Sequence, residues 1–97
     1  MKFEVQVDDR AVEDVIKAMS YYESQQNGLG DKFADVVERN LDYLIKNAHY
    51  QVRYKSVRTL PLKPFPFMFH FTIDESKKLV RVHAVIHTSL DPNKSWV

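Results

Sequence analysis

The spacing of the apolar residues changes once along the chain, and this change constrains which elements the sequence can form. In the first half, apolar side chains recur three and four positions apart, which defines one face of an amphipathic helix. Asn27-Gly28 interrupts this pattern with residues that adopt a positive φ at little cost. The sequence therefore predicts one helix running to about Gln26 and a second closing at Lys46-Asn47, folded back as an antiparallel hairpin.

In the second half, and briefly at the start, apolar and polar residues alternate as they do along a half-buried strand. Strands are predicted at residues 2–7, 52–58, 67–73 and 79–87. Asp8-Asp9 offers an N-cap for the first helix, because a carboxylate accepts hydrogen bonds from free helical N–H groups. Pro61, Pro64 and Pro66 predict a stiff, extended bend before the last two strands.

The apolar face of the first helix is predicted to hold Ala11, Val12, Val15, Ile16, Met19 and Tyr22. The last two strands are predicted to form a hairpin whose apolar face carries Phe67, Phe69, Phe71, Ile73, Val80, Val82, Ala84 and Ile86. Its opposite face, directed to solvent or a partner, would carry Met68, His70, Thr72, Arg81, His83 and His87.

Only the helical hairpin is available to cover the apolar face of these strands. The predicted fold class is therefore α+β, in the order β-α-α-β-β-β, with the helical hairpin packed on one face of a mostly antiparallel sheet. With 97 residues, the chain is expected to be a single domain over residues 1–97.

The composition of the chain is that of a globular protein, 44% apolar and 28% charged. It has no cysteine, hence no disulfide framework and no thiolate site, which fits a reducing cytosol. Charges within the first apolar stretch argue against a signal peptide, and no apolar run approaches the about 20 residues that span a bilayer. These features predict a cytoplasmic protein with no membrane partner.

The net charge of +1 conceals an uneven distribution along the chain. Residues 1–42 hold ten acidic and five basic side chains, a net −5, whereas residues 43–97 hold three acidic and nine basic ones, a net +6. A basic working surface is therefore expected on the sheet, suited to an acidic or anionic partner. The ordinary alternative is that helices expose acidic residues to solvent while strands use Lys and Arg to protect their edges.

Three histidines on the predicted polar face, His70, His83 and His87, suggest two chemistries. Zinc binding is disfavoured, since no Cys or nearby Asp completes a tetrahedral ligand set, so we expect no metal and no other cofactor. The other chemistry is metal-independent cleavage of RNA, in which histidines act as base and acid. Any basic sheet with histidines could be described in this way, so the pattern alone does not establish an enzyme.

Basic residues beside these histidines would have a role in either an enzyme or a binding protein. Arg58, Lys63 and Arg81 could offset the charge of a phosphorane, or could pair with acidic groups of a protein partner. Trp96 near the C-terminus is expected to dock and tie down the chain end.

Several segments together resemble the ParE/RelE toxin superfamily of bacterial toxin–antitoxin modules, and they cover nearly the whole chain in the same order. They are AVEDVI at 11–16, YYE at 21–23, QQNGLGDKF at 25–33, Arg58, FPFMFHFTID at 65–74, and VHAVIHTSLDP at 82–92 followed by Trp96. The resemblance implies a small type II toxin, a plasmid stabilisation system protein, that arrests growth when its antitoxin is degraded. In this superfamily, ParE-like members are held to poison DNA gyrase, and RelE-like members cleave mRNA on the ribosome.

Two positions depart from the family pattern. RelE-like ribonucleases typically have an arginine in the third strand where Met68 stands, and a thioether cannot stabilise a phosphorane. The match is therefore closer to ParE. Many members also have an arginine where Leu90 stands, and its absence would weaken contact with gyrase or RNA.

The resemblance implies a cognate antitoxin as partner, with an acidic, largely disordered tail that folds over the helical hairpin and the exposed sheet face. The residues predicted to bind the target or the antitoxin are Arg58, Lys63, His70, Arg81, His83, His87 and Trp96. A non-enzymatic, ParE-like toxin acting on gyrase is favoured, without specific DNA binding by this chain alone. The alternatives are a RelE-like endoribonuclease that uses the ribosome and mRNA, and a degenerate member that only binds antitoxin.

Overall fold

The computed structural model describes residues 3–47 and 57–89. In chain order, its elements are β1 (Glu4–Val7), α1 (Asp9–Gln25), α2 (Leu29–Asn47), β2 (Arg58–Pro61), β3 (Phe67–Asp74) and β4 (Leu79–His87). This order confirms the predicted α+β fold class. The strand predicted at 52–58 is present only from Arg58 onward within the described residues, because residues 52–56 lie outside them.

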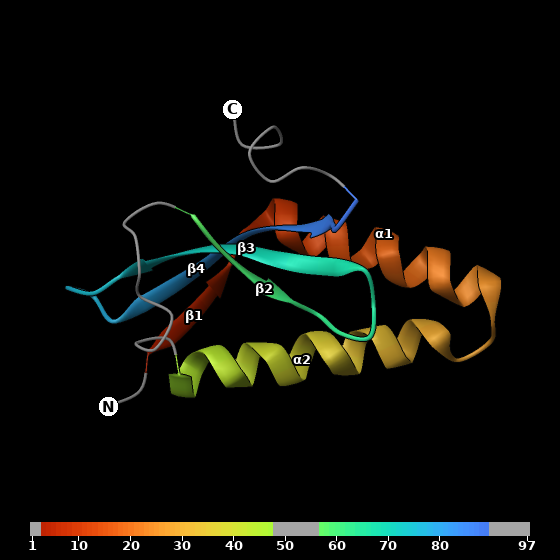
Figure 1. Cartoon of the computed structure of the whole chain (residues 1–97), viewed down its shortest axis with the longest axis horizontal. Helices are drawn as coiled ribbons and strands as arrows, with labels where there is room; N and C mark the ends of the chain where they lie inside the picture. The colour runs from red at the N-terminus through yellow and green to blue at the C-terminus, as the bar shows by residue number, and fades with distance from the viewer. Residues whose placement is uncertain (1–2, 48–56, 90–97) are drawn as a thin grey trace.

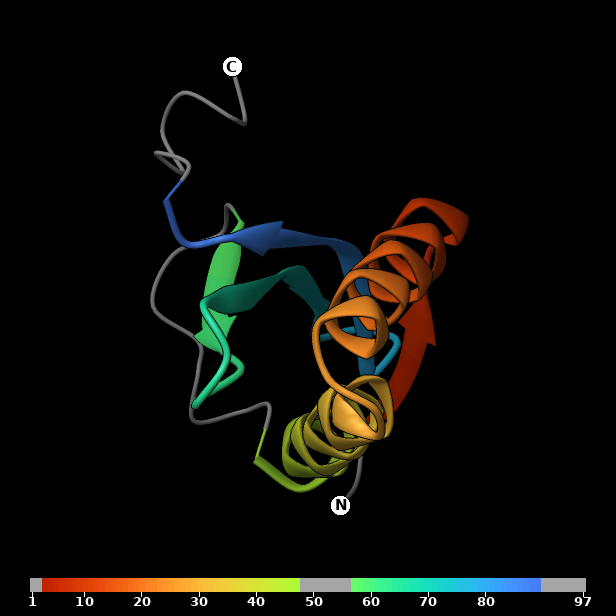
Figure 2. The same ribbon diagram turned by 90° about the vertical axis from the view of Figure 1, so that its right-hand side faces the viewer.

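The four strands form one sheet in the order β1-β4-β3-β2. β1 pairs with β4 in parallel, whereas the β3–β4 and β2–β3 pairs are antiparallel, so the sheet is mostly antiparallel as predicted. Both helices lie on the same side of this sheet (Figures 1 and 2). β2 is an edge strand, which explains how Pro61 can occupy its last position without costing a ladder hydrogen bond.

The turn between the helices depends on Glu23 and two glycines. Gly28 has φ +88°, a conformation that L side chains rarely adopt. A Cβ on Gly30 would lie 2.8 Å from the backbone oxygen of Met19, so the close approach of the two helices requires glycine there. The Glu23 carboxylate accepts hydrogen bonds from the N–H groups of Gly28 (2.9 Å) and Gly30 (3.0 Å). This places a negative charge at the N-terminus of α2, where the helix dipole favours it.

Apolar side chains from the helices and from one face of the sheet make the core. Its largest fully buried apolar side chains are Phe33, Leu44, Leu62, Phe69, Phe71, Val80 and Val82. On α1, Ala11 and Ala18 are buried, but Val12 and Ile16 are 43% and 58% exposed, so their predicted place on the buried face is wrong. The small alanines let the helix approach the sheet closely, and this directs the larger neighbours Val12 and Ile16 to its flank.

Four aromatic rings pack together beside the helical turn, and we call them the aromatic cluster: Tyr22, Phe33, Phe65 and Phe67. The ring centroids of Phe33 lie 5.5, 5.1 and 5.4 Å from those of Tyr22, Phe65 and Phe67 respectively. These are the tilted and edge-on arrangements that aromatic pairs prefer. The cluster joins α1, α2, the loop before β3 and β3 itself.

A β-bulge in β4 changes which side chains share a face. Phe69 pairs with Val85 and His70 with Ala84, but Phe71 pairs with Val82, so His83 is an extra residue without a partner position on β3. Beyond the bulge the alternation is shifted by one residue. Val85 and His87 therefore lie on the helix-facing side opposite Phe69 and Phe67.

The predicted composition of the two sheet faces is wrong beyond this bulge. Ala84 and Ile86, predicted to face the helices, lie opposite His70 and Met68 on the other face, and both are buried. His70, predicted to be exposed, is fully buried, and His87 lies on the helix-facing side. For Ala84, Ile86 and His87 the physical reason is the single inserted residue, which a strict two-residue period cannot anticipate. His70 keeps its predicted face and is buried there, opposite Ala84.

Neither of the two described helices is long and apolar enough to cross a membrane.

Candidate functional site

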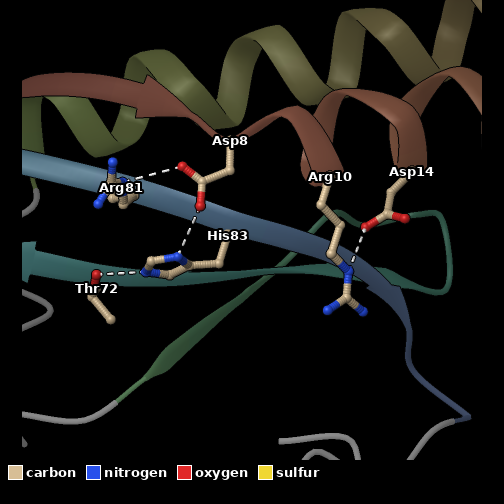
Figure 3. A network of polar contacts seen from close by, with 6 residues as sticks. All are labelled: Asp8, Arg10, Asp14, Thr72, Arg81 and His83. Atoms are coloured by element: carbon tan, nitrogen blue, oxygen red, sulfur yellow. Dashed lines mark hydrogen bonds and ion pairs between the residues drawn. The ribbon is translucent and has the colours of Figure 1, made fainter.

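Asp8, at the junction of β1 and α1, joins the start of the helix to the neighbouring strand. It occupies the predicted N-cap position, but its side chain makes no capping hydrogen bond, so the predicted role of this carboxylate is wrong. The carboxylate instead reaches β4, where Oδ1 lies 3.1 Å from Nε of Arg81 and Oδ2 lies 3.1 Å from Nδ1 of His83 (Figure 3). Two donors on one strand therefore outcompete the free N–H groups of the helix.

The imidazole of His83 has a second partner, the hydroxyl of Thr72. Thr72 Oγ1 lies 2.7 Å from Nε2 of His83 (Figure 3). We call Asp8, Thr72, Arg81 and His83 the polar network; it joins the β1–α1 junction, β3 and β4. Its ionic pair is partly solvated, with the side chains of Arg81 and Asp8 50% and 33% exposed. An exposed pair of this kind adds only about 0–1 kcal/mol to stability, so the network positions these groups more than it stabilises the fold.

The bulge accounts for the position of His83. Because His83 has no Cα partner on β3, its side chain need not follow the alternation of side chains between the two faces of β4. It reaches Asp8 on one side and Thr72 on the other. Its side chain is 26% exposed, so solvent and small solutes can reach it.

Asp14 is a second acidic residue of α1 that binds β4. Its Oδ2 accepts a hydrogen bond of 3.0 Å from the backbone N–H of Val85. β1 ends opposite Val82, so Val85 lies beyond the last residue that the parallel strand can pair. Asp14 therefore supplies the acceptor that a longer β1 would have provided for the N–H of Val85. Nε of Arg10 lies 3.9 Å from the same Asp14 oxygen (Figure 3).

His70 is a buried residue of the sheet. Burial and the positive charge of Arg10 both lower the pKa of His70 below its usual value, burial being the larger cause. The neutral imidazole is therefore the form that the fold accommodates. A side chain without exposed surface cannot present a proton donor or acceptor to a large partner.

His87 has different surroundings again. Its ring stands edge-on to Phe67 with centroids 5.1 Å apart. Its Nδ1 accepts a hydrogen bond from the backbone N–H of Ser89 (3.0 Å) and lies 2.8 Å from the hydroxyl of the same residue. The three histidines thus do not form the single cluster that the sequence suggested. Over residues 3–47 and 57–89, no group of three or more His, Cys, Asp or Glu side chains could hold a metal ion.

The predicted cations lie apart from one another. Arg81 belongs to the polar network on the central strand β4, Arg58 is half-buried at the start of the edge strand β2, and Lys63 is exposed in the loop after β2. Met68 is half-buried on β3 opposite Ile86. Trp96 and Leu90 lie outside the described residues.

Sequence reasoning missed Asp8, Asp14 and Thr72 as members of a site. The sequence pattern indicates only a helix cap for Asp8 and only a position on a polar face for Thr72. The signal that could have found the two aspartates is the run of acidic residues at the start of α1, which exceeds what one cap requires. No sequence signal distinguishes Thr72. Their partners on β4 depend on the parallel pairing with β1 and on the bulge, and neither is encoded in a local pattern.

Comparison with solved structures defines the class of this fold. A chain of the chromosomal ParDE TA (toxin–antitoxin) system from P. aeruginosa matches with a TM-score of 0.72 at 18% identity, over 88% of this chain and 95% of that one. A double mutant of the E. coli toxin RelE in the free state matches at 0.62 with 12% identity, over 98% and 93% of the two chains. The isolated E. coli RelE toxin matches at 0.58 with 11% identity, over 97% and 93%.

The protein therefore has the ParE/RelE-like fold that the sequence resemblance implied. Its TM-score is higher with the ParDE chain than with either RelE chain. No family model matches the sequence, and no curated protein matches it.

Proposed function

We propose that this protein is the ParE-like toxin component of a type II toxin–antitoxin module, acting in the cytoplasm and neutralised by a cognate antitoxin. The observation that carries the proposal is the match to the ParDE chain, with a TM-score of 0.72 over 95% of that chain. A match over nearly the full length of both chains supports a shared whole-domain role better than a shared motif would.

The target proposed for the toxin is a protein, DNA gyrase, and its mode of action is binding. Two features of the described residues support this choice over mRNA cleavage. His70 is fully buried and His87 packs on Phe67, so these two candidates for an acid–base pair do not share a site with His83. In addition, Met68 stands on β3 where a ribonuclease of this fold would benefit from a cation.

The surface proposed for the antitoxin is α1 together with the basic part of the sheet. Val12, Ile16 and Tyr21 of α1 are large apolar side chains that are 43%, 58% and 58% exposed. Large apolar side chains exposed on one helix, two of them four positions apart, are suited to an apolar helical or extended segment of a partner. Arg81 and Lys63 would pair with acidic residues of that segment and accelerate its association.

The test is expression of the chain in bacteria from a tightly controlled promoter, without an antitoxin. Growth is expected to stop, the purified protein is expected to inhibit supercoiling by gyrase, and ribosome-bound mRNA is expected to stay intact. Codon-specific cuts in mRNA would replace this proposal with the RelE-like alternative. Unimpeded growth at a confirmed expression level would contradict a toxin and favour a member that only binds antitoxin.

A further inference from the structure

Asp8, His83 and Thr72 are joined in the order carboxylate, imidazole, hydroxyl. Oδ2 of Asp8 lies 3.1 Å from Nδ1 of His83, and Thr72 Oγ1 lies 2.7 Å from Nε2 of the same ring. An ionised carboxylate can only accept hydrogen bonds, so the neutral imidazole carries its proton on Nδ1 and donates it to Asp8. Nε2 is then an acceptor, and the Thr72 hydroxyl donates to it (Figure 3). This connectivity is the one that activates a hydroxyl nucleophile.

We propose that Thr72 is a nucleophile, activated by His83, that accepts acyl groups from small activated acyl donors. The site is independent of the toxin proposal, since it requires neither an antitoxin nor a cellular target. It differs from metal-independent cleavage of RNA, because the attacking group is a side-chain hydroxyl of this chain and the product is an acylated protein.

The proposed step is a simple transfer. Thr72 Oγ1 attacks the carbonyl carbon of the donor, and its proton passes to Nε2 of His83. A bond forms between Oγ1 and the acyl carbon, and the bond from that carbon to the leaving group breaks. The leaving group departs with the electron pair and can take the proton back from His83. The products are O-acyl-Thr72 and the free alcohol or phosphate, and no oxidant, reductant or metal is needed.

The surroundings of Thr72 favour a small donor. Arg81 is the Cα partner of Thr72 across the β3–β4 pair, and its side chain is 50% exposed. Its Nε lies 3.1 Å from Oδ1 of Asp8, so the guanidinium and the carboxylate largely offset each other's charge beside the imidazole. Thr72 is half-buried, and the side chains of His83 and Asp8 are 26% and 33% exposed, so a small donor can approach from solvent.

The chain also contains an internal control, the pair of His87 and Ser89. Here Ser89 Oγ lies 2.8 Å from Nδ1 of His87, so a hydroxyl again contacts an imidazole. Within the described residues, no carboxylate bonds to His87 to hold its tautomer, and Nδ1 is already an acceptor for the backbone N–H of Ser89. The proposal therefore predicts that Thr72 is acylated and Ser89 is not.

The experiment treats the full chain with 4-nitrophenyl acetate and, separately, with acetyl phosphate, and maps the acetyl group by peptide mass spectrometry. One acetyl group per chain is expected on Thr72. Thr72→Ser, which keeps the hydroxyl, is expected to be acetylated at position 72. Thr72→Val, which has no hydroxyl, is expected to carry no acetyl group at position 72. His83→Gln is expected to lose about 10²–10⁴-fold in rate, the contribution of a positioned base. Ser89→Ala is expected to react at the rate of the unaltered chain.

Asp8 is a positioning residue in this proposal, and it has its own readout. In Asp8→Asn, the imidazolium that forms during attack lacks its counter-charge. The pH at which acetylation reaches half of its maximal rate is expected to be lower in Asp8→Asn than in the unaltered chain, while the circular dichroism spectrum stays the same. A purely structural role would leave this pH profile unmoved.

Acetyl groups confined to lysines or to Ser89 in the unaltered chain would overturn the proposal, whatever the variants do. So would a folded Thr72→Val that consumes the ester at the unaltered rate. Because the readout is a covalent mark on the purified chain, this result does not depend on whether expression arrests growth.

Discussion

The aromatic cluster and the polar network differ in the forces that hold them and in what they can contribute to function. The cluster packs Tyr22, Phe33, Phe65 and Phe67 on the helix-facing side of the sheet, with ring centroids 4.8 to 6.1 Å apart. The network joins Asp8 to β4 and, through His83, to Thr72. Apolar burial stabilises the first region, whereas the second consists of partly solvated polar contacts that add little.

This difference indicates that stability and activity are located in separable parts of the molecule. A substitution in the cluster should unfold the protein before it alters any surface. A substitution at an exposed group of the network should alter binding or reactivity while the fold persists. Substitutions in each region test this separation.

Phe33→Ala should be the most damaging single substitution of the cluster. The Phe33 side chain is fully buried and contacts the three other rings of the cluster, so its truncation leaves a cavity among them. The expected loss is about 3–5 kcal/mol in the free energy of unfolding, measured by denaturant titration. Val12→Ala on the exposed flank of α1 is the matched control, with an expected change within about 0.5 kcal/mol. Equal effects of the two would contradict the placement of the core.

Asp14→Ala should cost less, because it removes one hydrogen bond and no apolar packing of comparable size. The N–H of Val85 loses its acceptor, and an unsatisfied buried donor costs about 1–3 kcal/mol. Hydrogen exchange of the Val85 amide should accelerate in the same variant. Asp14→Asn keeps an acceptor oxygen and should retain most of the stability. If alanine and asparagine had the same effect, the hydrogen bond would not be what Asp14 contributes.

Much of the fold could be predicted from the sequence because its signals are local. The three-and-four spacing defined both helices, Asn27-Gly28 marked the turn between them, and the Phe67–Ile73 alternation defined β3. The antiparallel hairpin of β3 and β4 followed from the short turn that joins them. These features each depend on residues within a few positions of one another.

The candidate site was less predictable because it depends on contacts between distant segments. The Asp8–His83 contact joins residues 75 positions apart and the Asp14–Val85 contact joins residues 71 positions apart. Both depend on the parallel pairing of β1 with β4, for which no short turn exists. The bulge at His83 then moved His87 to the helix-facing side, and no spacing rule predicts an inserted residue.

The burial of His70 predicts a specific dependence of stability on pH. Burial and Arg10 lower the pKa of His70 in the folded state below its ordinary value of 6.5. At a pH between the folded-state and unfolded-state pKa values, His70 binds a proton in the unfolded chain but not in the folded one. The free energy of unfolding therefore has its full value above about pH 6.5 and decreases as the pH falls below that value. His70→Asn should flatten this part of the stability–pH curve, whereas His87→Gln should not. An unchanged slope in the His70 variant would place the acid-sensitive group elsewhere.

Arg81→Ala should have the smallest effect on stability and yet a measurable effect on toxicity. Its ion pair with Asp8 is half-exposed, so the free energy of unfolding should change by less than about 1 kcal/mol. If the toxin binds its partner through the basic sheet, the loss of this guanidinium should weaken growth arrest at equal expression, because charge complementarity sets the rate of encounter. Arg39→Ala on the exposed surface of α2 removes the same charge away from the sheet and should leave growth arrest unchanged. If the two variants arrested growth equally well, Arg81 would not belong to the binding surface. If Arg81→Ala unfolded, the polar network would contribute to the stability of the fold.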